Sequence, residues 1–371
     1  MKRIETLREI TVFQNAFSPF FYFGWPSITR LPGGALACVA SGFRLLHVCP
    51  FGKSVISYSF DDGKTFTPPA VALDTPLDDR DSGLVPFAGG RVILTSFNNT
   101  AHFQKITNEK RKDAEGADKA RYQLIDAYIE YVKALGNEDD YIGSLYRISD
   151  DGGFTFGPIH KSPVTCPHGP MCLPDGSLLY VGRRFSPINQ FDDGKEAYIE
   201  CWKLNEKDEL EYVSSIENVW DEYGILNSCE PHAICLPDGR ILVHIRVQRS
   251  GEHGEFTLYQ SESSDGGKTF TKPVPILPHL GGSPAHLFLH SSGVLISAYG
   301  YREKPYGIRI LLSKDLGKTW EDPYTLYDGG QSGDLGYPAT AELADGSLLT
   351  VYYENTSGQS RIIGRVWKIP E

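Results

Sequence analysis

The sequence predicts an all-β chain folded as a six-bladed β-propeller of four-stranded antiparallel blades. Two repeats support this prediction: a hairpin around a glycine turn that recurs six times, and an eight-residue box that recurs four times. A helical insertion at about residues 103–140 interrupts the second blade. Because such repeats bury their apolar faces only against one another, we expect residues 1–371 to form one domain.

The first repeat is a pair of β-rich runs joined by a tight turn. Asp-Gly, Gly-Gly or Ser-Gly occupies the turn, and glycine supplies the positive φ that a two-residue hairpin requires. The turn glycines are Gly34, Gly90, Gly176, Gly239, Gly293 and Gly346. They are 56, 86, 63, 54 and 53 residues apart, so one repeat has the length of one four-stranded blade, with a single long gap.

The second repeat has the pattern Ser-x-Asp-x-Gly-x-Thr-aromatic. Its copies are residues 59–66, 149–156, 263–270 and 313–320. The carboxylate of each box can accept N–H bonds within its own turn, and the aromatic residue can fill the blade. Recurrence in four blades indicates a structural device rather than a catalytic or calcium site. The third and sixth blades lack the box, and we expect a strand near residues 9–13 to close the last blade.

The long gap contains a periodic apolar pattern. Tyr122, Ile125, Ile129 and Val132 are spaced as on one helix face, and Gly136 follows as a stop signal. This insertion joins the second and third strands of its blade, on the face where the inner strands begin. It is either a decoration of the rim, a lid over a substrate or a dimer contact. The sequence does not determine the oligomeric state.

Composition excludes several classes of partner. The chain has 36 Lys+Arg against 47 Asp+Glu, a formal charge of −11, which argues against a nucleic-acid partner. No run approaches the ~18 apolar residues of a membrane span. Residues 1–11 lack the apolar core of a signal peptide, so the chain as written is expected in the cytoplasm; a trimmed leader would leave a secreted or periplasmic protein open. Seven scattered cysteines indicate reduced, buried thiols.

Charged and titratable residues gather where the inner strands begin, next to the central channel. The strand starts carry Trp25, Arg80, Asp81, His168, Glu230, His232, His286 and Tyr337, and the loops after the second strands add Arg44, Arg183, Arg184, Arg246 and Arg302. Burial there should shift pKa values. The three histidines come from distant blades without readable ligand spacing, so we predict no metal and no cofactor. Trp25 is suited to stacking on a sugar ring or to packing.

The boxes and hairpins together resemble the sialidase (neuraminidase) superfamily of six-bladed propellers over nearly the whole chain. The resemblance implies that Tyr337 is a nucleophile with Glu230 as its base. A neutral phenol suits an anomeric carbon that bears a carboxylate, because a carboxylate nucleophile would be repelled. Arg246 and Arg302 match arginines that bind the substrate carboxylate, with Arg44 as a further candidate. Glu354 resembles the acid that steadies one of these arginines.

Two departures from the family pattern concern the same site. The first arginine of the family is replaced by Gly24, in Phe23-Gly24-Trp25-Pro26. Losing one charged contact costs ~2–5 kcal/mol of binding where its partner stays buried. The stretch 43–54, where the family has an acid/base aspartate, contains no acid and offers only Arg44 and His47. Asp81, flanked by Arg80, or an axial histidine is then the candidate proton donor.

These observations predict an exo-acting glycoside hydrolase that cleaves a terminal, acidic sugar from a glycan. The catalytic candidates are Tyr337, Glu230 and Asp81, and the substrate-binding candidates are Arg246, Arg302, Arg44, Arg80, His168, His232, His286 and Trp25. One alternative is a polysaccharide lyase or a His/Asp-dependent glycosidase, with His168 or His232 as base beside Arg246. A second alternative is a non-catalytic, lectin-like propeller or assembly scaffold.

Overall fold

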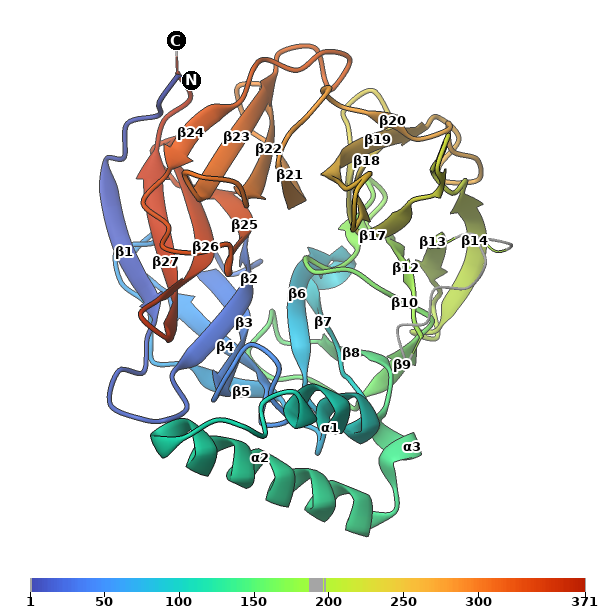
Figure 1. The fold of residues 1–371 in the computed structure, drawn as a ribbon. Helices are drawn as coiled ribbons and strands as arrows, with labels where there is room; N and C mark the ends of the chain where they lie inside the picture. Colours follow the sequence, from blue (N-terminus) through green and yellow to red (C-terminus); the bar gives the residue numbers. More distant parts are fainter. Residues whose placement is uncertain (1, 187–195, 197, 371) are drawn as a thin grey trace.

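The computed structural model describes residues 2–186, 196 and 198–370. The strands are arranged radially around a central axis, and the two ends of the chain lie side by side (Figure 1). The prediction of an all-β propeller with few helices is confirmed. No helix within the described ranges combines the length and apolarity needed to cross a membrane.

The largest sheet contains both ends of the chain. It has eight strands in the order β25-β26-β27-β2-β3-β4-β5, with β1 paired to β27. Its strands are β1 (Arg8–Phe13), β2 (Tyr22–Arg30), β3 (Leu36–Arg44), β4 (Lys53–Ser59), β5 (Ala70–Leu73), β25 (Leu335–Glu342), β26 (Leu348–Thr356) and β27 (Gln359–Trp367). A single parallel pair, Tyr22 with Ser360, joins its two antiparallel halves. Two predicted blades therefore share one continuous sheet, and β1 closes the last of them as expected.

The remaining strands form four larger sheets and one small hairpin. Three of the sheets have four strands: β6 (Arg80–Phe87), β7 (Arg91–Phe97), β8 (Ser144–Ser149) and β9 (His160–Ser162); β17 (Asn227–Cys235), β18 (Ile241–Arg249), β19 (Glu255–Ser263) and β20 (Val274–Pro275); and β21 (Gly282–Leu289), β22 (Leu295–Tyr301), β23 (Gly307–Ser313) and β24 (Tyr324–Tyr327). The fourth comprises β10 (Val164–Thr165), β11 (Met171–Cys172), β12 (Leu178–Arg184), β13 (Ile199–Leu204) and β14 (Leu210–Ile216). The hairpin is β15 (Trp220–Asp221) with β16 (Gly224–Ile225).

A bulge recurs at the start of the inner strands. The pairing register shifts in β2, β6, β17, β21 and β25. Trp25, Asp81, Glu230 and Tyr337 lie at four of these shifts and have φ of 57°, 47°, 46° and 50°. A bulge turns one side chain out of the alternating pattern, and a positive φ in a non-glycine residue is costly enough to be concentrated at functional sites. The fold therefore aims the same position of four strands toward one end of the axis.

The aspartate of each of the four boxes accepts hydrogen bonds from within its own turn. In the box at β19, Asp265 accepts the Thr269 N–H at 2.9 Å and the Thr269 hydroxyl at 2.6 Å. The equivalent bonds recur at Asp61, Asp151 and Asp315. The interpretation of the boxes as structural devices is confirmed by these contacts.

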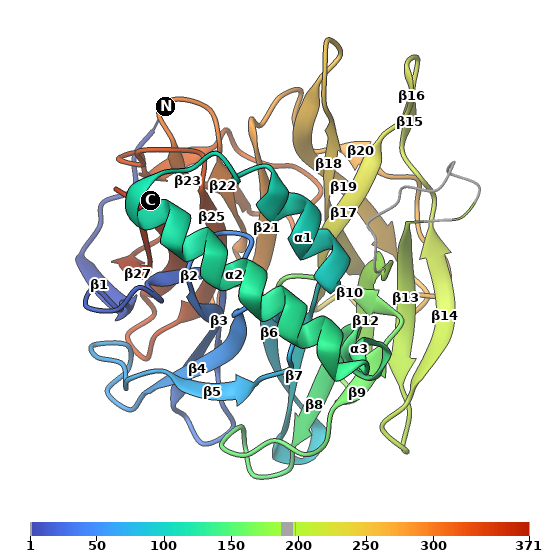
Figure 2. The same ribbon diagram turned by 60° about the horizontal axis from the view of Figure 1, so that its bottom comes forward.

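The predicted insertion is helical. It follows β7, which begins after the 3₁₀ turn η1 (Ala88–Gly90), and contains α1 (Ala101–Glu109), α2 (Gly116–Leu135) and α3 (Glu138–Tyr141). The two longer helices lie together along one side of the propeller (Figure 2). Ile125, Ile129 and Val132 of α2 are buried in one cluster with Leu45 and Cys49 of the loop after β3. The insertion thus packs against the loop that carries His47.

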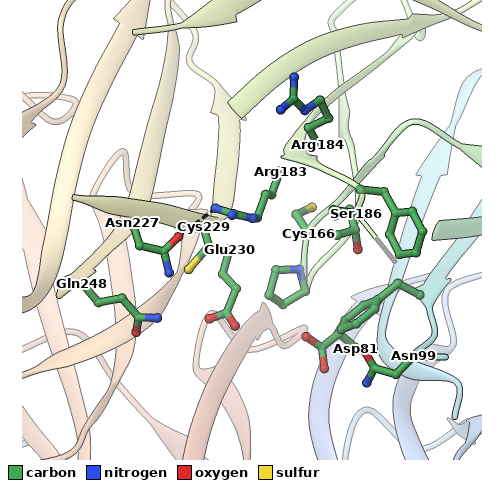
Figure 3. Close-up of a pocket in the computed structure, with 14 residues that line it drawn as sticks. Asp81, Asn99, Cys166, Arg183, Arg184, Ser186, Asn227, Cys229, Glu230 and Gln248 are labelled. Atoms are coloured by element: carbon green, nitrogen blue, oxygen red, sulfur yellow. Dashed lines mark hydrogen bonds between the residues drawn. The ribbon is translucent and has the colours of Figure 1, made fainter. Parts of the chain in front are cut away.

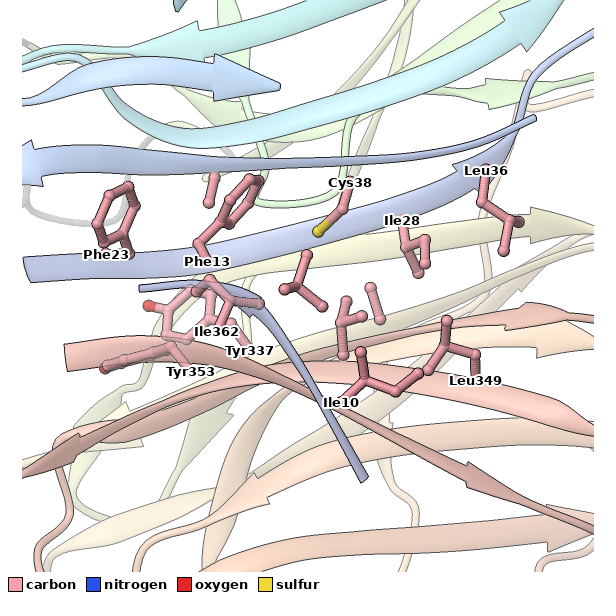
Figure 4. Close-up of a cluster of buried hydrophobic side chains, with 14 of the residues drawn as sticks. Ile10, Phe13, Phe23, Ile28, Leu36, Cys38, Tyr337, Leu349, Tyr353 and Ile362 are labelled. Atoms are coloured by element: carbon pink, nitrogen blue, oxygen red, sulfur yellow. The ribbon is translucent and has the colours of Figure 1, made fainter. Parts of the chain in front are cut away.

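An apolar cluster lies between the two halves of the eight-stranded sheet. It contains Phe13, Phe23, Ile28, Tyr337 and Tyr353 (Figure 4). The Tyr337 ring is therefore packed within the core of the protein, and close packing restricts its orientation. All seven cysteines are free, and five of them are buried.

Candidate active site

Three residues predicted to act together meet at one end of the axis. The Tyr337 hydroxyl donates a 2.7 Å hydrogen bond to Glu230 Oε1, and Arg246 Nη1 donates to Glu230 Oε2 at 2.6 Å. Arg246 Nη1 also lies 3.4 Å from the Tyr337 oxygen. The predicted contact between these residues of β25, β17 and β18 is therefore present.

Burial and neighbouring charges shift the pKa values of Tyr337 and Glu230 in opposite directions. Burial, followed by the charges of Glu230 and Asp81, raises the pKa of Tyr337 well above its ordinary value. Burial alone would raise the pKa of Glu230 as well, but Arg246 and the Tyr337 hydrogen bond outweigh it and hold that pKa below its usual range. At neutral pH the pair is a phenol beside an ionised carboxylate. A carboxylate so placed can accept the phenol proton when the oxygen attacks.

Arg302 supplies a second cation beside the phenol. Its guanidinium lies 5.6 Å from the Tyr337 ring centroid and 5.7 Å from that of Phe256. Its Nε is buried without a hydrogen-bond partner, and no carboxylate of the described residues forms an ion pair with it. Arg246, by contrast, is bonded to Glu230 and Gln248. Arg302 is thus a cation next to the phenol whose charge no carboxylate of the described residues neutralises in an ion pair.

A pocket of about 220 Å³ opens between the sheets that carry Asp81 and Glu230. The two carboxyl groups project into it from opposite sides (Figure 3). Arg183 and Asn227, whose side chains form a 2.9 Å hydrogen bond, lie along the same wall as Gln248. No residue from 103–140 belongs to the lining that the structure describes.

Asp81 presents a buried carboxyl group with a perturbed pKa. The side chain is buried, and its Oδ1 has no hydrogen-bond partner. Burial raises the pKa of Asp81 to about 7; Arg80 opposes the increase, and the charge of Glu230 adds to it. A carboxyl group that holds its proton near neutral pH is a suitable general acid.

Two of the predicted substrate-binding residues face the core instead. Trp25 is 1% exposed, and the guanidinium of Arg80 covers its ring at 4.0 Å. Arg44 is fully buried, with Nη1 bonded to Asp78 at 2.5 Å and Nη2 to the His47 carbonyl oxygen at 2.9 Å. The prediction that Trp25 or Arg44 contacts the sugar does not fit this burial. Trp25 instead packs against the guanidinium of Arg80. Arg80 donates to the same His47 carbonyl oxygen as Arg44, at 2.9 Å.

Aromatic and polar side chains occupy the region around Gly24. A Cβ at Gly24 would meet the Tyr22 ring at 3.3 Å and the Tyr353 ring at 3.7 Å. The hydroxyls of both tyrosines donate to Asp334 Oδ1, at 2.8 and 3.0 Å. His47 Nδ1 bonds the same oxygen at 2.9 Å. Glu354 bonds Arg361 at 2.7 Å, so the acid that resembles the family's arginine-steadying residue holds a different arginine here.

The three axial histidines form a separate cluster deeper in the channel. The rings of His168, His232 and His286 lie 4.4–5.5 Å apart and border a cavity whose lining shares no residue with that of the Asp81–Glu230 pocket. His232 Nδ1 accepts the Leu287 N–H at 2.9 Å, and His286 Nδ1 accepts the Thr340 N–H at 3.3 Å, so both connect neighbouring inner strands. None of the three histidines belongs to the described lining of the Asp81–Glu230 pocket. No group of side chains suited to a metal ion is found across the described ranges.

Sequence reasoning missed several residues of this region. Gln248 follows Arg246 by two positions in β18, so strand alternation places both on one face and could have identified it. Asn227 and Asn99, which also line the pocket, carry no such signal. Asp334 precedes Tyr337 by three residues, but its pairing with His47 connects positions 287 apart.

The radial sheets and the buried Tyr–Glu–Arg set define a sialidase-like β-propeller. Residues 144–350, more than half of the chain, match the family described as BNR repeat-like domain, and the chain belongs to this family. No curated protein matches the sequence.

Solved structures share the fold at low sequence identity. A protein of unknown function from Dyadobacter fermentans is 20% identical, with both chains fully covered and a TM-score of 0.75. The NanB sialidase of Streptococcus pneumoniae is 13% identical over 97% of this chain and 70% of its own, with a TM-score of 0.66. The α-L-arabinanase of Penicillium chrysogenum is 15% identical over 98% of each chain, with a TM-score of 0.60. The likeness confirms the propeller; two different glycosidases among these neighbours leave the sugar open.

Proposed function

We propose that this protein is an exo-acting glycoside hydrolase that releases a terminal acidic sugar from a glycan. The observation that carries the proposal is the 2.7 Å hydrogen bond from the Tyr337 hydroxyl to Glu230. The proposal also counts the eight-stranded sheet as two blades, which gives the six blades predicted from the repeats.

In the first half of the proposed reaction, the Tyr337 oxygen bonds to the anomeric carbon as the bond to the leaving oxygen breaks. Glu230 takes the phenol proton, and Asp81 gives its proton to the leaving oxygen. Arg302 and Arg246 hold the carboxylate of the sugar. An acidic sugar is proposed because Arg302 lacks a carboxylate partner among the described residues, and because a phenol suits an anomeric centre next to a negative charge.

The two alternatives from the sequence receive less support. A lyase based on His168 or His232 needs these side chains beside Arg246, but they border the separate channel cavity. A purely binding propeller does not require the positive φ of Asp81, Glu230 and Tyr337 or the perturbed pKa of Asp81.

A panel of 4-methylumbelliferyl glycosides tests the proposal. It should contain sialosides and uronides, with neutral hexosides and arabinosides as comparisons. Hydrolysis of an acidic member by the wild-type chain, lost in Tyr337→Phe and Glu230→Gln, supports the proposal. An activity that survives Tyr337→Phe unchanged, or no hydrolysis of any member, contradicts it.

A further inference from the structure

His47 forms a pair with Asp334, and its ring shares the indole of Trp25 as a packing partner with Tyr337. His47 Nδ1 lies 2.9 Å from Asp334 Oδ1. The Asp334 carboxylate also accepts bonds from the hydroxyls of Tyr22 and Tyr353 and from the Asn355 amide. Burial would raise the pKa of Asp334, but these bonds outweigh it and hold the pKa below its usual range. The Tyr22 hydroxyl, which donates to Asp334, also lies 2.8 Å from His47 Nδ1. Because an ionised carboxylate only accepts hydrogen bonds, a neutral His47 that donates to Asp334 carries its proton on Nδ1 and keeps a lone pair on Nε2.

The lone pair of His47 is available to a ligand. Its side chain is 45% exposed, and Nε2 has no hydrogen-bond partner among the described residues. The ring packs edge-on against Trp25 at 5.0 Å, and the Tyr337 ring packs edge-on against the same indole at 6.4 Å. The backbone of His47 is held as well, because Arg44 and Arg80 both donate hydrogen bonds to its carbonyl oxygen. His47 is thus an oriented imidazole within the group of aromatic rings that contains Tyr337.

Burial favours the neutral form of His47. Loss of hydration around the ring lowers the pKa of His47, and the positive charges of Arg80 and Arg44 add to the decrease, whereas the hydrogen bond to Asp334 and the negative charge of Asp334 oppose it. Asp81 has the opposite perturbation, with its pKa raised to about 7. The pKa of the carboxyl group is thus shifted toward its protonated form, and the pKa of the imidazole toward its neutral form. Opposite pKa shifts of two titratable groups are typical of a general acid and a general base in one active site.

We propose that His47 is a further catalytic residue, the general base that activates water in the second half of the reaction, and that Asp334 is its positioning residue. This inference rests on the proposed function, because the second half of that reaction is the hydrolysis of a glycosyl-tyrosine by an activated water. Nε2 takes a proton from water, whose oxygen bonds to the anomeric carbon as the bond to the Tyr337 oxygen breaks. The Tyr337 oxygen regains its proton from Glu230, and the proton on His47 exchanges through solvent to Asp81.

The test separates the two halves of the reaction in the full-length chain. His47→Asn retains an N–H donor near the Nδ1 position and removes Nε2, and His47→Gln is a second variant that lacks the base. The probe is the methylumbelliferyl glycoside that the wild-type chain hydrolyses. We expect kcat to fall about 10²- to 10⁴-fold, kcat/KM to stay unchanged because it reports the first half, and a burst of methylumbelliferone to appear. Azide, a nucleophile that needs no base, should restore turnover and yield a glycosyl azide.

Asp334→Asn should reduce kcat less than His47→Asn does and should displace its pH profile, which a purely structural role would not do. A parallel fall of kcat and kcat/KM in His47→Asn, or no change in either, overturns the role of His47 while leaving Tyr337 as nucleophile intact. A wild-type chain inactive on the whole panel overturns the proposed function and this inference together.

Discussion

Asp81 and Glu230 face each other across one pocket from different sheets, and each has a positive φ at the bulge of its inner strand. Arg246 and the Tyr337 hydroxyl keep Glu230 ionised, whereas Asp81 has an unpaired Oδ1 and a pKa raised to about 7. The pKa values of two carboxyl groups of one pocket are thereby shifted in opposite directions. In the proposed reaction, this difference makes Asp81 the acid and Glu230 the base.

Asp81→Asn should remove the proton donor. We expect kcat on a substrate with a poor leaving group to fall about 10²- to 10⁴-fold. An aryl glycoside, whose leaving group needs little protonation, should be affected much less. Equal losses on both substrates would contradict the role of Asp81 as acid.

The same substitution should change the pH dependence of stability. The folded pKa of Asp81 lies above the unfolded value of 3.8, so the folded state binds more protons and the wild-type free energy of unfolding falls as pH rises from about 4 to about 7. Asparagine has no such proton to lose. The stability of Asp81→Asn relative to wild type should therefore increase over this range, by at most about 4 kcal/mol. Thermal unfolding of both proteins at pH 5 and pH 8 measures the difference; a constant difference would contradict the raised pKa.

Arg302→Met should reduce selectivity for an anionic substrate. Because Arg302 has no protein carboxylate to leave behind among the described residues, its loss should appear in ligand binding, as a decrease of about 2–5 kcal/mol in transition-state binding. The methyl ester of the same substrate serves as the matched control, since it lacks the charge. A similar decrease for acid and ester would show that Arg302 does not bind the carboxylate.

Gly24→Arg should not restore a missing substrate contact. The new side chain must enter between the rings of Tyr22 and Tyr353, which hold Asp334 and would lie only 3.3 and 3.7 Å from the first side-chain carbon. We expect a lower Tm and no gain in affinity for an acidic glycoside, whereas Gly24→Ala should be tolerated with a small loss of stability. Tighter binding in the arginine variant would contradict this account.

Asp265→Asn should affect the fold and leave the site unchanged. Hydrogen bonds within the box lower the pKa of Asp265 to about 2, with the Thr269 hydroxyl as the largest cause. A lowered pKa stabilises the folded state above the unfolded pKa, and this contribution is lost as pH falls through about 2. We therefore expect Tm at pH 7 to fall by roughly 2–4 °C with kcat unchanged, and the difference to vanish in acid. Calorimetry across pH measures the first quantity, and turnover of the glycoside measures the second.

Repeats made the fold predictable, because each box and hairpin acts within its own sheet. Glu230 and Tyr337 start inner strands, and Arg246 lies in the strand that follows Glu230, but the resemblance to the sialidase superfamily named the three as a group. Trp25 and Arg44 were expected at the ligand, but both are buried, which residue type alone does not reveal. Arg80 covers Trp25, and Asp78, held at 2.7 Å by Gln104 of the insertion, neutralises Arg44.

The pairing of His47 with Asp334 could not be read from the sequence. The two residues lie in irregular loops, where neither alternation nor spacing fixes a partner. The axial histidines show the converse case. Their position on inner strands was apparent from the sequence. His232 nevertheless lines a different cavity from Glu230, because the two residues that separate them along the extended strand β17 place them at different depths of the channel.

The central claim is that Tyr337 forms a covalent bond to the sugar. Incubation of the chain with a 2,3-difluorinated acidic glycosyl donor of the sugar hydrolysed in the panel should slow the second half of the reaction and trap that bond. Peptide mass spectrometry should then place one glycosyl adduct on Tyr337, absent in Tyr337→Phe. An adduct on a carboxylate, or rapid turnover of the donor with no adduct at any residue, would contradict the account.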